Sequence, residues 1–255
     1  MSSERRLGVL GGTFDPIHYG HLRAGEAAET ALALDEIRVI PAHDPPHRAL
    51  DPRASAFHRF ALCALAIEGK PRWRLSDAEL TRTGPSYTAQ TLRALHAEGW
   101  KPSQIFFILG SDAFAEIATW YDFPAVLKSA NYAVVARPGT TLKAAWERFD
   151  PAGVEDPSVS EGSTGFFRVN AETPDVSSTD IRARLSAGLS IDDLVPPPVA
   201  RYILNHRLYV ERPPSAVAPG LPERLNGVPS DATADKESHD ERSAAVNDLH
   251  GKAGH

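Results

Sequence analysis

Short apolar runs alternate with helical patterns along about the first 210 residues of the chain. The apolar runs predict buried strands at 7–11, 37–41, 105–110, 132–136 and, with a weaker pattern, 166–169. Apolar residues at helical spacing predict helices at 20–33, 55–68, 89–98, 113–118, 179–187 and 197–206. Strands without polar alternation, separated by helices, indicate an α/β fold with a parallel sheet covered on both faces.

The composition changes near residue 210. No aromatic residue follows Tyr209, and the remaining stretch is polar and rich in proline. Such a segment buries too little apolar surface to offset the entropy lost on ordering. We therefore predict a single domain over residues 1–210 and a disordered tail over 211–255.

Charge and cysteine content exclude some classes of protein. The 27 basic and 33 acidic residues give a net charge of −6, which argues against a basic nucleic-acid binder but not against a local basic pocket. The single cysteine, Cys63, excludes a disulfide framework and a cysteine-based zinc site. No run of 18 apolar residues and no signal-like start occur, so we expect a cytoplasmic protein without a membrane span.

The turn after the first predicted strand concentrates candidate chemistry. It begins with Gly11 and Gly12, which let the backbone approach a ligand, and it brings His18 and His21 to the start of the next helix. Exposed N–H groups and the helix dipole make such a start an anion site. A lone histidine there is usually a cap, but two histidines three residues apart after a glycine-rich entry favour phosphate binding.

The string at 11–21, Gly-Gly-Thr-Phe-Asp-Pro-Ile-His-Tyr-Gly-His, contains the H-x-G-H signature of the nucleotidyltransferase superfamily. As a whole it resembles the bacterial nicotinate-nucleotide adenylyltransferase family. The resemblance implies a Rossmann-like, doubly wound parallel sheet of the nucleotidyltransferase type. It also implies that His18 and His21 contact the ATP phosphates and stabilise charge during catalysis. The other residues it places at the ATP site are Gly11, Gly12, Thr13 and Phe14.

A second segment, residues 176–182, resembles the I-S-S-T-x-x-R signature of the same superfamily, with valine in place of isoleucine. Helix capping by itself explains Ser177 or Ser178, with Asp180 at capping-box spacing. It does not explain Arg182, one turn along, whose guanidinium suits a phosphate. The resemblance implies that Ser177, Ser178, Thr179 and Arg182 bind ATP, with Arg182 catalytic.

Four further positions are assigned to ATP, two by the resemblance and two by their place at the end of a strand. Arg48 belongs to a Pro-Pro-His-Arg element, and Arg137 to an Arg-Pro-Gly turn near the adenine. Gly110 and Asp112 follow the central strand, where a carboxylate accepts hydrogen bonds from ribose hydroxyls, although Asp112 is equally suited to capping the next helix. His43 and His47 have a metal-like spacing, but the intervening prolines prevent a helix, so no protein-bound metal is predicted.

Two segments point to a pyridine nucleotide as the second substrate. Residues 85–92 resemble the family's P-S-Y-T-x-x-T-L segment, which implies that Thr88 helps to hold the pyridine carboxylate. Residues 119–121 resemble its T-W-Y element, which implies stacking by Trp120, a backbone contact at Tyr121, and a shared role for Asp112. A lone tryptophan is more often part of a core, so the assignment depends on the combination.

The sequence therefore predicts an enzyme of NAD biosynthesis that joins nicotinate mononucleotide to ATP, with Mg²⁺ carried by the ATP phosphates. No nucleic-acid or membrane partner is expected, and the oligomeric state stays open. Two alternatives remain. One is a sibling adenylyltransferase that acts on nicotinamide mononucleotide or phosphopantetheine. The other is a nucleotide-binding regulator without turnover.

Overall fold

A computed structural model describes residues 4–46, 52–136, 164–172 and 174–210. The predicted tail at 211–255 lies outside these residues. The strands are β1 (Leu7–Gly12), β2 (Glu36–Pro41), β3 (Trp73–Leu75), β4 (Ile105–Gly110), β5 (Asn131–Ala136) and β6 (Phe166–Asn170). The helices are α1 (Tyr19–Ala31), α2 (Ala56–Ala66), α3 (Thr88–Ala97), α4 (Ser111–Ala115), α6 (Ser178–Ser186) and α7 (Pro197–Asn205), with 3-10 turns at Pro102–Gln104, Ile117–Thr119 and Ala125–Lys128.

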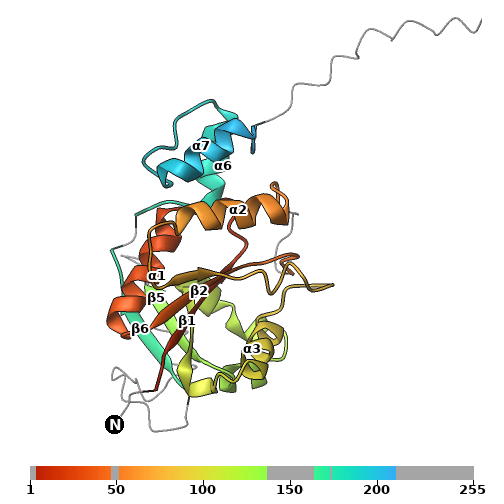
Figure 1. The fold of residues 1–255 in the computed structure, drawn as a ribbon, viewed down its shortest axis with the longest axis vertical. Coiled ribbons are helices and arrows are strands. Elements are labelled where there is room, and N and C mark those ends of the chain that lie inside the picture. The colour runs from red at the N-terminus through yellow and green to blue at the C-terminus, as the bar shows by residue number, and fades with distance from the viewer. Residues whose placement is uncertain (1–3, 47–51, 137–163, 173, 211–255) are drawn as a thin grey trace, which may run out of the picture. The chain divides into compact units, whose positions relative to one another are not determined.

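The six strands form one parallel sheet in the order β3-β2-β1-β4-β5-β6 (Figure 1). The chain runs outward from β1 through β2 to β3, then returns to the other side of β1 with β4. The strand order therefore reverses between β1 and β4, which is where ligands bind in doubly wound folds. The parallel, doubly wound sheet predicted from the sequence is confirmed.

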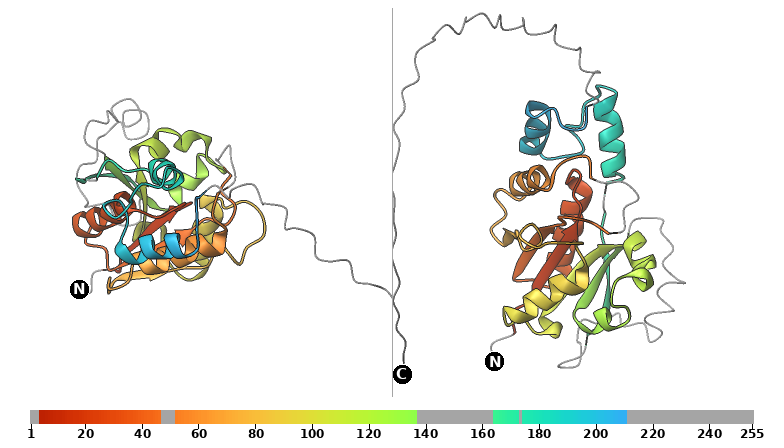
Figure 2. Two further views of the ribbon diagram at one scale, coloured as in Figure 1. Left: turned by 90° about the horizontal axis from the view of Figure 1, so that it is seen from above. Right: turned by 90° about the vertical axis from the view of Figure 1, so that its right-hand side faces the viewer.

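Alternate side chains of each central strand enter different cores. Leu10 and Ile108 pack with α1, α2, α6 and α7, whereas Val9 and Phe107 belong to the core under α3 and α4. This alternation follows from the two-residue period of a strand. Figures 1 and 2 show α6 and α7 grouped at the same end of the molecule as α2.

The elements differ from the sequence prediction in two places. The three-residue strand β3 was not predicted, because Trp73–Leu75 contains an arginine and offers too short an apolar run. The helix expected at 113–118 divides into α4 and the 3-10 turn at Ile117–Thr119. The other predicted strands and helices are present, and most of their ends lie within a residue or two of the expected positions.

Candidate active site

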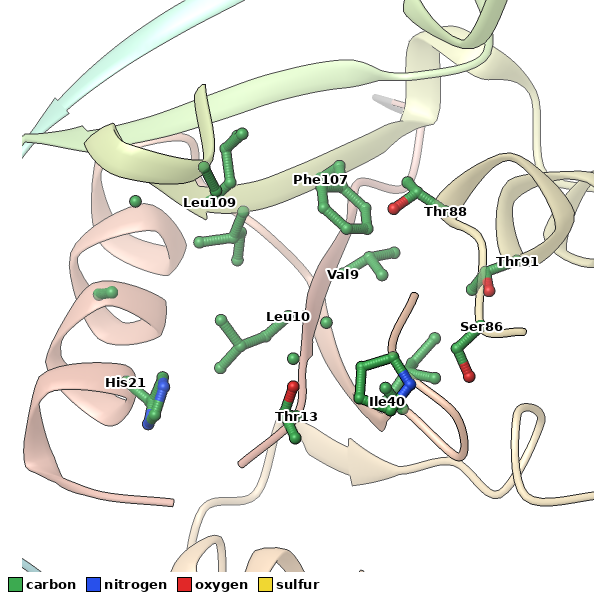
Figure 3. Close-up of a pocket in the computed structure, with 18 of the residues that line it drawn as sticks. Val9, Leu10, Thr13, His21, Ile40, Ser86, Thr88, Thr91, Phe107 and Leu109 are labelled. Atoms are coloured by element: carbon green, nitrogen blue, oxygen red, sulfur yellow. The ribbon is translucent and has the colours of Figure 1, made fainter. Parts of the chain in front are cut away.

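A cavity of about 520 Å³ opens where β1 and β4 end (Figure 3). Its wall includes Gly11 and Gly12 at the end of β1 and Leu109 and Gly110 at the end of β4. We call one side the histidine end, formed by Gly12, Thr13, His18 and His21. The opposite side, the tryptophan end, is formed by Glu79, Ser86, Thr88, Thr91, Phe107 and Trp120. In Figure 3, His21 faces Ser86, Thr88 and Thr91 across the cavity.

The two histidines occupy fixed positions at the start of α1. His18 has the extended backbone of an N-cap residue, with φ −148° and ψ 172°, and it is only 3% exposed. Its ring stacks on that of His21 with the centroids 3.7 Å apart. The Nδ1 atom of His21 accepts a hydrogen bond from the backbone N–H of His18 at 3.3 Å. In the neutral ring this leaves the proton on Nε2 of His21, which makes that atom a hydrogen-bond donor.

The glycine between the histidines is required by close packing. A Cβ atom at Gly20 would lie 3.0 Å from the ring of His18 and 3.2 Å from Cγ1 of Val176. Both distances are shorter than comfortable carbon contacts, so any larger residue would displace the ring. The H-x-G-H spacing is therefore a packing requirement, and it brings Val176 of the second signature against the first.

Two further contacts join the signatures, which are about 155 residues apart in the sequence. Ser178 donates its hydroxyl to the carbonyl of Pro16 at 2.9 Å. Arg182 donates through Nη1 to the carbonyl of Asp15 at 2.7 Å and through Nη2 to Oγ1 of Thr179 at 3.1 Å. Ser177 caps α6 by accepting the N–H of Asp180 at 3.1 Å. The structure thus sets the second signature directly behind the histidine turn.

The carboxylate of Asp15 is a buried charge beneath this turn. It accepts the backbone N–H groups of Arg53 and Ala54 at 2.9 and 3.1 Å, and Nη1 of Arg182 lies 3.9 Å from it. Burial raises the pKa of the nearby Tyr209 phenol, and the Asp15 carboxylate raises it further. Tyr209 therefore stays protonated beside Asp15.

Arg59 is a functional candidate that the sequence prediction missed. It is 1% exposed, and its guanidinium donates to four backbone carbonyls, those of Thr13, Ala42, His43 and Ala54, at 2.6 to 3.2 Å. Thr13 and Ala42 line the cavity, so one side chain ties two of its loops together. The available signal was an arginine on the apolar face of a helix, since Leu62, Cys63 and Ala66 follow it at helical spacing.

The tryptophan end combines rings from separate segments. Trp120 meets Phe107 edge to face with ring centroids 5.7 Å apart, and Thr88 begins α3 beside them. Tyr121 does not line the cavity; it is 49% exposed and stacks on Tyr87 at 4.5 Å. This stack brings the segments around Thr88 and Trp120 next to each other, as their predicted shared role requires.

Several predicted site residues lie elsewhere or outside the described chain. Phe14 is buried with φ 51°, and its ring edge meets His21 at 5.0 Å instead of lining the cavity. Asp112 and Gly110 line the cavity, whereas the second signature does not: Ser177, Ser178, Thr179 and Arg182 are absent from its wall. The N-cap of α4 is Gly110, so Asp112 is not a capping residue. Arg48 and Arg137 lie outside the described residues.

Three cavity residues were not among the predicted site residues: Glu79, Ser86 and Thr91. Ser86 and Thr91 belong to the segment 85–92 that resembles the family, whereas Glu79 had no such signal. Thr91 donates its hydroxyl to Oε1 of Glu79 at 2.5 Å, and Ser86 accepts the backbone N–H groups of His43 and Asp44 at 2.9 and 3.2 Å. Glu79 follows β3, the strand that the sequence did not predict, so its position against α3 could not be anticipated. Cys63, by contrast, is inert because burial raises the pKa of its thiol.

Within residues 4–46, 52–136, 164–172 and 174–210, no group of three or more histidine, cysteine, aspartate or glutamate side chains is placed to hold a metal ion. In the same residues, no helix is long and apolar enough to cross a membrane.

Comparisons with known proteins decide the family. A family model described as cytidylyltransferase-like matches residues 9–184. The protein named "Probable nicotinate-nucleotide adenylyltransferase" of Symbiobacterium thermophilum is 42% identical over 207 residues, which covers 80% of this chain and 95% of that protein. The protein of the same name from Chromobacterium violaceum is 40% identical over 217 residues, covering 80% of this chain and 98% of the relative.

The chain belongs to the nicotinate-nucleotide adenylyltransferase family. The recognition made from the two signatures is thus confirmed. A solved structure supports the same fold at lower identity. The nicotinic acid mononucleotide adenylyltransferase of Plasmodium falciparum complexed with NaAD superposes with a TM-score of 0.62 at 19% identity, covering 81% of this chain and 98% of that one. The complex of that enzyme with APC gives a TM-score of 0.61.

Proposed function

We propose that this chain transfers the adenylyl group of ATP to nicotinate mononucleotide, yielding nicotinate adenine dinucleotide and pyrophosphate in NAD biosynthesis. The observation that carries the proposal is the single cavity that joins the His18–His21 pair at the start of α1 to the Trp120–Thr88 wall opposite. One end suits a polyphosphate and the other an aromatic ring, which is what this pair of substrates requires. The names of the family members support the same reaction.

The reaction needs no side-chain nucleophile. An oxygen of the acceptor's 5′-phosphate attacks the α-phosphorus of ATP, and a new P–O bond forms on that side. The bond from the α-phosphorus to the bridging oxygen breaks, and pyrophosphate leaves with its electron pair. Catalysis then consists of in-line positioning and stabilisation of the charge that develops on the phosphate oxygens.

The histidine end supplies that stabilisation. Nε2 of His21 is the donor atom of the neutral ring, because Nδ1 accepts the His18 N–H. The N-terminus of α1, which has 13 residues, adds the positive end of its dipole. Gly11, Gly12 and Thr13 let the phosphates approach the backbone. Ser177, Ser178, Thr179 and Arg182 support the site from behind, with the guanidinium of Arg182 contributing positive charge next to the turn.

The other assigned residues divide between the two substrates. We assign Gly110 and Asp112 to the ribose hydroxyls, because both lie on the cavity wall at the end of β4. Trp120 is the platform for the pyridine ring, and Thr88 with the backbone at Tyr121 supplies donors for the pyridine carboxylate. Phe14 acts by packing beside His21. Arg48 and Arg137 keep their proposed ATP contacts on sequence grounds alone.

We propose that Mg²⁺ enters the site bound to the phosphates of ATP. The described residues around the cavity include no group of three or more His, Cys, Asp or Glu side chains placed to hold a metal ion, and Mg²⁺ in nucleotide sites is bound largely through phosphate oxygens and water. When bound to ATP, Mg²⁺ offsets phosphate charge.

We also propose that the protein is located in the cytoplasm.

The decisive test is an acceptor panel. Purified full-length chain is assayed for pyrophosphate release with ATP, Mg²⁺ and nicotinate mononucleotide, nicotinamide mononucleotide or phosphopantetheine. Backbone donors satisfy both oxygens of the acid but meet the NH₂ group of the amide with another donor. Two such mismatches, at about 1–3 kcal/mol each, predict a preference for the acid of roughly 10²–10⁴-fold in kcat/KM. Equal values for acid and amide would overturn the nicotinate assignment, and no turnover with any acceptor would favour a regulator.

A further inference from the structure

One buried carboxylate on the cavity wall has no role in the reaction above. Glu79 is 8% exposed and lines the tryptophan end. It accepts the hydroxyl of Thr91 at 2.5 Å. Thr91 is also buried, and it lies on α3 one turn after Thr88, the residue that we assign to the pyridine carboxylate. The Glu79 carboxylate therefore belongs to the part of the cavity that receives the acceptor.

The charge of Glu79 is balanced from outside the cavity. Nη2 of Arg82 lies 4.0 Å from Oε1 of Glu79 and donates to Oγ1 of Thr91 at 3.0 Å. The hydroxyl of Thr91 thus links the two charged groups, accepting from one and donating to the other. Arg82 itself does not line the cavity. The pair is neutral as a unit, with the carboxylate on the cavity side and the guanidinium behind it.

This neutrality matters because the cavity wall is otherwise acidic. Among the described residues that form it, three carry carboxylates, Glu79, Asp112 and Glu116, and none is a lysine or arginine. Within the described part of the chain, Glu79 is the one of these three that forms an ion pair. Without Arg82, a carboxylate of low exposure would face an anionic acceptor, where charge repulsion is weakly screened.

We propose that Arg82 is a specificity-determining residue for the acceptor, acting through Glu79. By cancelling the Glu79 charge, it lets a pyridine nucleotide that carries a carboxylate bind at the tryptophan end in preference to its neutral amide counterpart. The inference rests on the proposed function. Without Arg82, the Glu79 carboxylate would repel the acid but would accept a hydrogen bond from the NH₂ group of the amide. Loss of Arg82 should therefore weaken binding of the acid and not of the amide.

The test is a double-mutant cycle on Arg82 and Glu79. The quantity measured is the acid-to-amide ratio, which is kcat/KM for nicotinate mononucleotide divided by kcat/KM for nicotinamide mononucleotide. Arg82→Gln keeps an N–H donor for Thr91 but removes the positive charge. We expect this variant to lower the ratio about tenfold, mainly through a higher KM for the acid. Glu79→Gln, which leaves Arg82 unbalanced, is expected to raise the ratio. The double variant removes both charges and should return the ratio to within about twofold of wild type, which is the non-additive behaviour expected of two residues in one network.

Matched controls separate this role from a structural one. Arg38→Gln removes an arginine from another ion pair, with Glu36 and Glu98, whose members do not line the cavity, and should leave the ratio unchanged. Thermal unfolding of each variant monitors the fold. If Arg82→Gln does not fold, the direction of change in Glu79→Gln carries the test.

An unchanged ratio in Arg82→Gln overturns the inference, as does a lower ratio in Glu79→Gln or a double variant that stays as low as Arg82→Gln. A wild-type chain that transfers adenylyl groups to neither nucleotide overturns the proposed function, and this inference with it. A wild-type chain that is active with the acid while the cycle fails removes the inference alone.

Discussion

At the histidine end of the cavity, hydrogen bonds from several elements hold the turn that faces the ligand, whereas the tryptophan end combines buried side chains, such as Phe107 and Thr91, with the partly buried ring of Trp120. His18 is almost fully buried, and Arg59 and Arg182 tie the turn before it to α2 and α6. Tyr121, next to Trp120 in the sequence, is half exposed, and its ring stacks on that of Tyr87. The turn that faces the phosphates is therefore fixed by residues outside the cavity, whereas acceptor choice depends on side chains of the cavity wall itself, both buried and partly exposed.

The largest effect on activity is expected from the histidine end. His21→Ala should lower kcat by roughly 10²–10³-fold, because it removes a preorganised donor from the phosphates. Steady-state kinetics with both substrates, together with a thermal melt, would measure this. A variant that is folded and nearly as active as wild type would contradict the assigned role of His21.

The same end should also carry the largest stability effect. Arg59→Met leaves four backbone carbonyls without their buried donor, which we expect to cost about 3 kcal/mol or more in the free energy of unfolding. For a domain of this size that corresponds to a fall in Tm of about 6–12 °C. The matched control is Arg23→Met, which removes an exposed arginine paired with Glu26 and should cost less than about 0.5 kcal/mol. Equal Tm values for the two variants would show that the hydrogen bonds of Arg59 contribute little to stability.

A smaller effect on activity is expected at the tryptophan end, and it should be equal for the two pyridine nucleotides. Trp120→Ala should reduce kcat/KM about tenfold for both pyridine nucleotides, because stacking does not distinguish acid from amide. The ratio between them should therefore be preserved. Trp100→Ala, which removes a half-buried tryptophan that does not line the cavity, is the control. A changed acid-to-amide ratio in Trp120→Ala would assign specificity to the ring itself and not to the groups around it.

The smallest effect is expected from removing residues 211–255. Their composition lacks core-forming residues, so a chain ending at Val210 should keep kcat/KM within about twofold and the free energy of unfolding within about 0.5 kcal/mol. Kinetics and thermal melts of the truncated chain would measure both. A large loss in either would show that residues 211–255 complete the domain or the site.

Local pattern determined most of the fold, since the long apolar runs such as Ile105–Gly110 have one reasonable interpretation and their alternation with helices implies a parallel sheet. It failed at Trp73–Leu75, where a three-residue strand is stabilised by pairing with β2 and not by its own composition. Position in the sheet cannot be read from so short a segment.

The sequence by itself also determined the two signatures and the family, because glycines, histidines and a capping serine at fixed spacing specify a local backbone whatever surrounds them. The tertiary structure alone decided that Val176 packs on Gly20, that Arg59 braces two loops, and that Arg82 stands behind Glu79. These contacts join residues that no local periodicity relates. A buried charge is tolerated only where distant partners satisfy it, and the chain must fold before those partners meet.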